Sequence, residues 1–240
     1  DCDRPARPFD PAQLDAFIAG IEEIAAFRGM RLSVEEDFDA FARVSRTAPG
    51  RAPITPMFDP ERSDLGGGKA FWIKGVDEAG DVVHLQAARV DDLDGMPLID
   101  WLEGLWAFYA DPAATAKAQE VCFCAAPMAM EITGRVAYHG EVWLRDGCNS
   151  FRGYGLGGVL PRMAIAVALK RWQPDYMYGI AWPRIVEKGM ARFYGYRHFQ
   201  PHGAMWNWQR QPQILHGDLI WLTRQDMIDM THKKGRPPGQ

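Results

Sequence analysis

A strand, a glycine-rich loop and a helix follow one another in the middle of the chain, and this order limits the folds open to it. Residues 134–145 alternate apolar and polar side chains with period two, which predicts a half-buried strand. Four glycines then crowd into six residues, at positions 153, 155, 157 and 158. Apolar residues at helical spacing continue to Trp172, and Lys170 and Arg171 suit the C-terminal end of the helix dipole.

Glycines in this position indicate an anion site. They allow backbone amides to approach a ligand closely and to adopt positive φ angles. The first amides of the following helix have no intrahelical acceptor and carry a partial positive charge, so the loop and helix together predict a phosphate cradle. The formal net charge of the chain is −4, so any such anion site must be local.

Two common phosphate motifs fit this loop poorly. A P-loop requires Gly-Lys-Ser/Thr, whereas this chain has Gly157-Gly158-Val159, which argues against a nucleoside triphosphatase. The letters Gly153-x-Gly155-x-x-Gly158 match a dinucleotide fingerprint, but eight residues separate the end of the strand from the first glycine. Asp175 precedes the next strand instead of closing it, so a dinucleotide-dependent oxidoreductase is the least favoured interpretation.

Composition predicts one large soluble domain. The chain has 240 residues, of which 47% are hydrophobic and 24% charged. Its four cysteines are too few for a disulfide scaffold, and Cys122 and Cys124 have no second pair at ligand spacing, so no metal is expected. No apolar run reaches the roughly 18 residues of a membrane span, and no signal peptide is visible. We therefore expect a cytoplasmic protein that binds neither nucleic acid nor membrane.

The periodicity along the chain predicts an α/β succession of helices and strands. Two N-terminal helices are expected at about 11–28 and 33–46, with Ser33 as the N-cap of the second. Later helices are expected at 96–109 and 113–124, from the glycine loop to Trp172, and at 183–194 and 225–232. Strands are expected at 70–76, 82–90, 134–145, 176–182, 204–209 and 218–223.

The run Arg152-Gly153-Tyr154-Gly155-Leu156-Gly157 resembles the Arg/Gln-x-x-Gly-x-Gly/Ala motif of the GNAT acyltransferase superfamily. The order of elements around it agrees, since a long strand precedes the loop and a helix, a strand, a helix and two strands follow. Gly195-Tyr196 matches the Gly-aromatic pair near the end of the second helix. The resemblance covers roughly residues 70–225.

The resemblance implies a GNAT-like fold: a mixed, mostly antiparallel central sheet flanked by helices, with an N-terminal helical pair. We expect a single domain over 1–240, with a helical region at 1–69 and a core at 70–232. A helical insertion of about 95–130 precedes the main strand, and 233–240 form a disordered tail.

The resemblance also implies acetyl-CoA, or another acyl-CoA, as co-substrate and no metal. Its pyrophosphate is expected on the amides of the loop, at Arg152, Gly153, Tyr154, Gly155, Leu156, Gly157 and Gly158. Its pantetheine arm is expected along the main chain of Trp143, Leu144 and Arg145, in a gap where the main strand splays from the next one.

Acyl transfer to an amine requires a base and, for the departing thiolate, an acid. Strand alternation places Ala137, His139, Glu141 and Trp143 on one face, so Glu141 is the first candidate base and His139 the second. The family's acidic tyrosine usually stands four residues before the Gly-aromatic pair, where this chain has Ala191. Tyr194 is the remaining candidate acid.

Several alternatives stay open at this stage. Trp101, Trp106, Phe108 and Tyr109 either pack the insertion onto the sheet, which is the commoner use of such residues, or line a substrate pocket. The acceptor, a small-molecule or peptide amine, is not readable from the sequence. A donor with a longer acyl chain on CoA or on a carrier protein, a non-catalytic acyl-CoA sensor, and a homodimer all remain compatible with it.

Overall fold

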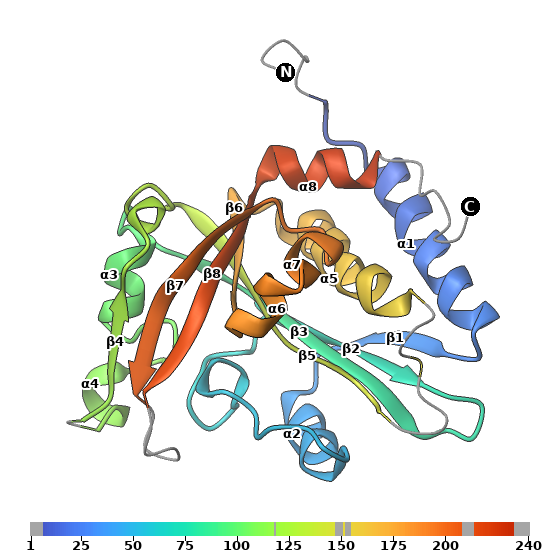
Figure 1. Cartoon of the computed structure of the whole chain (residues 1–240), viewed down its shortest axis with the longest axis horizontal. Coiled ribbons are helices and arrows are strands. Elements are labelled where there is room, and N and C mark those ends of the chain that lie inside the picture. The colour runs from blue at the N-terminus through green and yellow to red at the C-terminus, as the bar shows by residue number, and fades with distance from the viewer. Residues whose placement is uncertain (1–6, 118, 147–150, 152–154, 208–213, 233–240) are drawn as a thin grey trace.

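The computed structural model describes residues 7–117, 119–146, 151, 155–207 and 214–232, and its centre is an eight-stranded mixed sheet between two layers of helices (Figure 1). The order in the sheet is β1-β2-β3-β5-β6-β8-β7-β4. The strands are β1 (Arg31–Glu35), β2 (Ala70–Val76), β3 (Val82–Asp92), β4 (Val121–Cys124), β5 (Arg135–Leu144), β6 (Tyr176–Ala181), β7 (His198–Asn207) and β8 (Leu215–Thr223). Neighbouring strands are antiparallel except β5 and β6, which are parallel, so the predicted mixed and mostly antiparallel sheet is confirmed.

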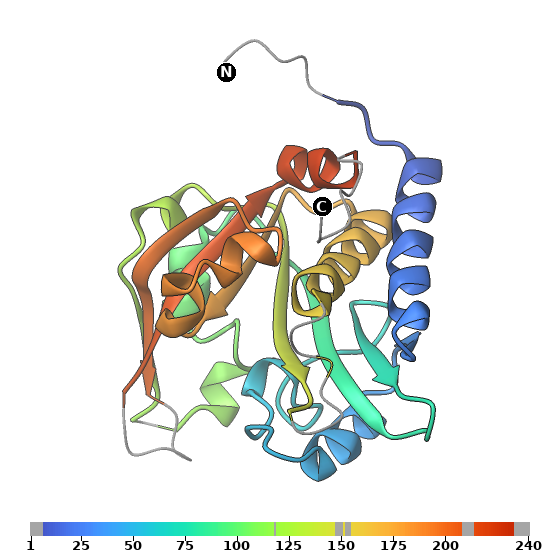
Figure 2. The ribbon, with the colours of Figure 1, turned by 45° about the vertical axis from the view of Figure 1, so that its right-hand side comes forward.

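Helices cover both faces of this sheet. They are α1 (Pro11–Phe27), α2 (Phe38–Thr47), α3 (Leu98–Glu103), α4 (Pro112–Thr115), α5 (Leu156–Trp172), α6 (Pro183–Glu187), α7 (Met190–Phe193) and α8 (Arg224–Thr231), with short 3-10 turns η1 (Pro56–Phe58) and η2 (Pro127–Met130). Helices α1, α5 and α8 pack together on one face, as Figures 1 and 2 both show, while α2, α3 and η2 lie on the other. Among the described residues, no helix combines the length and apolarity needed to cross a lipid bilayer.

The sheet splits in its middle. Strands β5 and β6 pair only where Val136–Tyr138 faces Tyr176–Tyr178, and beyond these pairs the two strands diverge. In Figure 1 the half that holds β1, β2, β3 and β5 runs down to the right, and the half that holds β6, β8, β7 and β4 runs down to the left. Helix α2 and the loop after it fill the space below the split. This is the splayed geometry that the sequence resemblance implies.

Helix α5 is buried on nearly all sides, because it lies between the sheet and the layer of α1 and α8. Its apolar residues pack against both core strands and neighbouring helices, as expected for a helix that is hydrophobic all round. It starts after Gly155, whose φ of 78° is left-handed, and ends at Gln173, which is also left-handed. The predicted helix from the glycine loop to Trp172 is therefore confirmed.

The N-terminal region differs from the prediction. Residues 31–35 form the edge strand β1, so Ser33 does not cap a helix, and its hydroxyl instead donates to Glu35 Oε1 over 2.8 Å. Helix α2 begins later, where the Asp37 carboxylate accepts from the Ala40 amide. The two N-terminal helices also pack on opposite faces, α1 on α5 and α2 on β2, so they do not form a packed pair.

Three predicted helices are shorter than expected. The helix at 96–109 shrinks to α3, because Gly104 and the left-handed Leu105 end it. The helix at 113–124 becomes α4 followed by β4, whose alternating burial and pairing with β7 override helical propensity. The helix at 183–194 breaks into α6 and α7 at Gly189, which has a φ of 70°.

Candidate functional site

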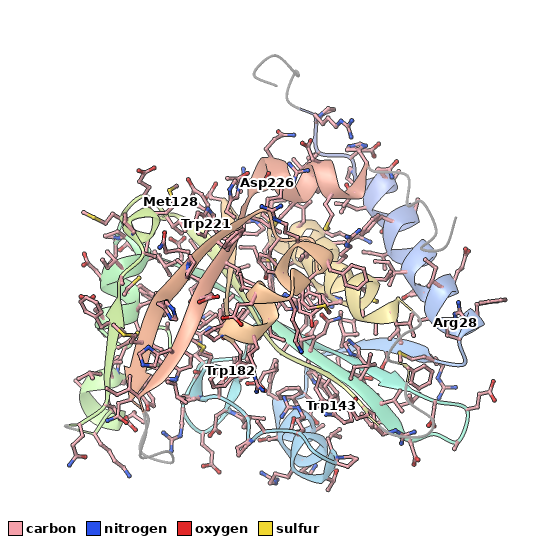
Figure 3. All side chains as sticks on the ribbon, in the orientation of Figure 1. Arg28, Met128, Trp143, Trp182, Trp221 and Asp226 are labelled. Atoms are coloured by element: carbon pink, nitrogen blue, oxygen red, sulfur yellow. The ribbon has the colours of Figure 1, made fainter. Side chains whose placement is uncertain are left out.

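A cleft of about 270 Å³ opens where β5 and β6 separate. Its walls come from the loop before η1, from β5, β6, β7 and β8, and from the segment around α6 and α7. Figure 3 labels Trp143 on β5 and Trp182 before α6, which both line this cleft. Its lining residues are Arg51, Ala52, Pro53, Thr55, Pro56, Met57, Phe108, Tyr138, His139, Gly140, Glu141, Val142, Trp143, Gly179, Ile180, Ala181, Trp182, Ile185, Tyr194, Tyr196, Trp206, Leu215 and Ile220.

A β-bulge in β5 shapes the wall of this cleft. Gly140 faces Ala87 and Trp143 faces Leu85, so two residues of β5, Glu141 and Val142, lie opposite a single residue of β3. Glu141 takes a φ of 61°, which is uncommon for a residue other than glycine. Such a conformation persists only where surrounding contacts enforce it, and the side chain of Glu141 shows which contacts do so.

The carboxylate of Glu141 is tied to the loop that follows α2. Its Oε1 accepts from the Thr55 amide over 2.8 Å and from the Thr55 hydroxyl over 2.7 Å, and its Oε2 is paired with Arg51. The side chains of Arg51 and Glu141 are only 3% and 6% exposed. Three donors thus already bind the carboxylate oxygens, which leaves little of this group accessible to an amine or a water molecule.

His139 lies in a buried chain of hydrogen bonds on the other face of the sheet. Gln86 Nε2 donates to the Leu160 carbonyl of α5 over 2.7 Å, so its Oε1 is left to accept from His139 Nε2 over 3.0 Å. Because His139 Nε2 then carries the proton, Nδ1 is the acceptor and receives the Tyr196 hydroxyl over 3.0 Å. The carbonyl of α5 thus fixes the tautomer of His139 through Gln86.

Burial determines the protonation of the side chains in this hydrogen-bonded chain. Desolvation, with a smaller contribution from His84, lowers the pKa of His139 to about 3. Desolvation also raises the pKa of Tyr196 well above its ordinary value. Near neutral pH the imidazole and the phenol are therefore both uncharged, and the Tyr196 hydroxyl occupies the accepting nitrogen of His139.

The bulge overturns the prediction that His139 and Glu141 are neighbours on one face. His139 points to the α5 side, where its partners are, and Glu141 points to the side of α2 and η1. The extra residue reverses the alternation, so Trp143 packs with the α2-side core cluster and Leu144 with residues of α5. The two candidate bases on β5 therefore reach the cleft from opposite faces of the sheet.

The main-chain groups of the three residues predicted to hold pantetheine do not all point to the same edge of β5. The Trp143 carbonyl accepts from His84 Nδ1 over 2.8 Å, and the Arg145 amide donates to the Val83 carbonyl over 2.8 Å, so these groups are directed toward β3. Successive residues of a strand direct their main-chain groups to opposite edges, so Leu144 directs its own toward the split. The carboxylates of Asp77 and Asp81 pair with the Arg145 side chain.

The glycine loop lies partly outside the described residues. Arg152, Gly153 and Tyr154 belong to that part, and the described portion starts with Gly155, the left-handed N-cap of α5. Leu156 is buried, and Gly157 has open space where a Cβ would stand. At Gly158 a Cβ would lie 2.3 Å from a ring carbon of Phe193, so this glycine permits α7 to approach α5.

Tyr194 lines the cleft at the end of α7, near the buried Tyr196. Ala191, at the position of the family's usual tyrosine, is 2% exposed and packs in the core. Of the insertion aromatics, Phe108 both packs in the core and lines the cleft, whereas Trp106 is 41% exposed and stacks on Trp101. Phe108 thus combines the two predicted uses, while Tyr109 only packs in the core.

No group of three or more metal-ligating side chains occurs among the described residues. Cys122 and Cys124 are buried free thiols on β4, and burial raises the pKa of each.

Sequence reasoning did not single out Tyr196, Gln86, Arg51 or Thr55, which are the hydrogen-bond partners of the two candidate bases. One signal was present, since Gln86 and His84 interrupt the apolar run of β3 and a buried strand seldom carries polar residues without partners. Nothing in the local pattern pointed to Arg51 or Thr55, which meet Glu141 across 90 and 86 residues of chain.

Comparison with known proteins gives distant structural matches only. No protein-family model and no curated protein sequence matches the chain. The structure is similar to an N-acyl amino acid synthase from uncultured soil microbes, at 11% identity and a TM-score of 0.39, over 91% of this chain and 93% of that one. It is also similar to a spermidine N-acetyltransferase from Vibrio cholerae in complex with CoA and spermine, at 7% identity and a TM-score of 0.41, over 83% and 98%. At this level the matches carry no argument, and the function proposed below rests on the chain's own topology and side chains.

Proposed function

We propose that this protein is an N-acyltransferase that takes an acyl group from a coenzyme A thioester and transfers it to a primary amine. The observation that carries this proposal is the split between β5 and β6 beside the glycine N-terminus of α5. The split leaves an edge of β5 along which an extended arm with amide groups can pair, and the helix terminus suits a pyrophosphate. Acetyl-CoA is the donor that the sequence resemblance implies.

Anion binding in this proposal falls to the backbone at the start of α5. The first amides of a helix lack intrahelical acceptors and lie at the positive end of its dipole. Gly157 has room for a phosphate group where another residue would place its side chain. The remaining loop residues, Arg152, Gly153 and Tyr154, are proposed ligands on the sequence motif alone.

In the proposed reaction the lone pair of a neutral amine attacks the thioester carbonyl carbon. A carbon–nitrogen bond forms, the carbon–sulfur bond breaks, and sulfur leaves with the electron pair as a thiolate. The amine loses one proton to a base and the thiolate gains one from an acid, so atoms and charge balance without a redox partner.

Three side chains of the cleft are candidates for these proton transfers. Glu141 remains our first candidate base, acting through a water molecule once a substrate opens its contacts with Arg51 and Thr55. The burial of His139 makes direct uptake of a proton costly, so its proposed contribution passes through Tyr196. Tyr194 is the candidate acid for the thiolate because its side chain lines the cleft at the end of α7.

A screen of amine acceptors with acetyl-CoA, read out as released thiol, tests the proposed function. Calorimetry on Gly157→Glu should show that binding of CoA is lost, because a carboxylate would occupy the cradle. Thermal stabilisation by NAD but not by CoA or acetyl-CoA would instead favour a dinucleotide site and refute the proposal.

A non-catalytic acyl-CoA sensor is the second candidate function, and one observation favours it. Both candidate bases already have hydrogen-bond partners within the protein, as a site without turnover would allow. A protein that binds acyl-CoA but releases no thiol with any primary amine, whether acetyl- or octanoyl-CoA is the donor, would be a sensor. Turnover with one amine would exclude that interpretation.

A further inference from the structure

The cleft offers a substrate no net charge from its described side chains. Its one cation, Arg51, and its one anion, Glu141, neutralise each other inside the protein. His139 is held neutral by burial. A polycationic acceptor would find no unpaired carboxylate in this lining, and an anionic one would find no unpaired cation.

The remaining lining is predominantly apolar and aromatic. Beyond the polar pair, the wall on the side of β6, β7 and β8 consists of Ile180, Trp206, Leu215 and Ile220. Trp182 extends this wall and lies 6.3 Å from Trp206 between ring centroids, although it is 51% exposed. An exposed tryptophan beside an apolar cleft leaves hydrophobic surface in water until a ligand covers it.

The volume of the cleft exceeds what an acetyl group fills. One water molecule takes up about 30 Å³ of liquid and a methylene group is of similar size, so 270 Å³ has room for roughly nine such groups. An acetyl group would occupy less than a third of that space, and the rest of the apolar wall would stay wet.

We infer that the cleft takes the chain of a hydrophobic acyl donor, a thioester of about six to ten carbons. This inference rests on the proposed function, because it assumes that the thioester carbonyl lies where β5 and β6 diverge. Ile180, Trp206 and Leu215 lie on β6, β7 and β8, across the split from the strand that carries Glu141. The acyl tail follows the apolar wall, and the amine approaches from the polar side.

Calorimetry with CoA and with acetyl-, butyryl-, hexanoyl-, octanoyl- and decanoyl-CoA tests this inference on the intact protein. Each buried methylene contributes about 0.8 kcal/mol, which corresponds to about a fourfold lower Kd, so partial burial predicts a two- to fourfold gain per methylene. From butyryl- to octanoyl-CoA the Kd should therefore fall by about 20- to 200-fold.

A substitution that fills part of the cleft, compared with a matched control outside it, locates the acyl chain of the donor. Ile180→Trp should raise the Kd of octanoyl-CoA at least tenfold while changing that of acetyl-CoA much less. Ile99→Trp makes the same change at another half-buried isoleucine, on α3 outside the cleft, and should leave the chain-length series intact. If Ile180→Trp does not fold, Leu215→Trp fills the same wall from the more accessible start of β8.

The outcomes separate this inference from the function on which it rests. If neither CoA nor any thioester binds, the proposed function fails and the inference fails with it. If all thioesters bind with one Kd, the donor site stands and the hydrophobic-chain inference is overturned. It is also overturned if chain length has no effect while amines with apolar tails bind the CoA complex more tightly than hydrophilic ones, because the wall would then serve the acceptor.

Discussion

Glu141→Gln probes the contact that enforces the bulge in β5. The substitution keeps the size of the side chain but removes the charge that neutralises Arg51. In the native protein one carboxylate oxygen accepts both donors of Thr55 and the other is paired with the Arg51 guanidinium. An amide has one accepting oxygen only, so it satisfies either Thr55 or Arg51.

The expected cost follows from the burial of this pair. With side chains 3% and 6% exposed, Arg51 and Glu141 gain little from solvent when their partner is lost. Removing one member of a buried ion pair costs about 3–5 kcal/mol, because the other charge stays buried and uncompensated. We therefore expect Glu141→Gln to lower the free energy of unfolding by about 3 kcal/mol or more.

A double-mutant cycle with Arg51→Met, followed by urea unfolding, measures the coupling. Methionine removes the charge of the guanidinium, which in the native protein lies over the ring of Phe41, and keeps an apolar side chain in its place. In that background Glu141→Gln should cost almost nothing, since it removes an orphaned carboxylate, so the coupling should exceed about 2 kcal/mol. Asp64→Asn, which breaks the exposed pair with Lys69, is the control and should cost less than about 1 kcal/mol. Single-mutant costs that add within about 0.5 kcal/mol would refute this account of the bulge.

Three further predictions concern the helix start and the buried chain. Gly157→Ala should be neutral or stabilise the protein by about 0.4–1 kcal/mol. Gly158→Ala should destabilise it by about 1–3 kcal/mol, because the added Cβ meets a ring of α7. Equal melting temperatures of the two variants would contradict this prediction. Tyr196→Phe leaves His139 Nδ1 without its donor and should lower the free energy of unfolding in urea by about 1–3 kcal/mol. Tyr178→Phe removes a buried hydroxyl with no partner among the described residues and should lower it little. Similar costs of the two variants would count against the hydrogen-bonded chain around His139. Burial lowers the pKa of His139 from about 6.5 to about 3, so the unfolded state binds the proton first as the pH falls. The free energy of unfolding should therefore fall by up to about 1.4 kcal/mol per pH unit below pH 6.5. The same pH dependence of stability in His139→Gln would exclude His139 as its cause.

The sequence by itself determined the elements whose apolar pattern is long and regular. The strand β5 and the helix α5 were predicted from local spacing, and both appear in the structure. The mixed, mostly antiparallel sheet that the resemblance to the GNAT superfamily implied is present as well. Short segments were misassigned, as at Ser33 and at β4, because pairing with a distant strand outweighs a weak local preference.

Only the tertiary structure decided which partners the polar side chains of the cleft have. A bulge at Glu141 reverses the alternation of β5, and no local pattern predicts it, because the donors that hold it come from Arg51 and Thr55, 90 and 86 residues earlier in the chain. In the same way, the roles of His139 were fixed by Tyr196, 57 residues away, and by Gln86 on a neighbouring strand. Periodicity reports which face of an element is buried. The partner of a buried polar group depends on which strands and loops meet in space, and that is settled only when the whole sheet has formed.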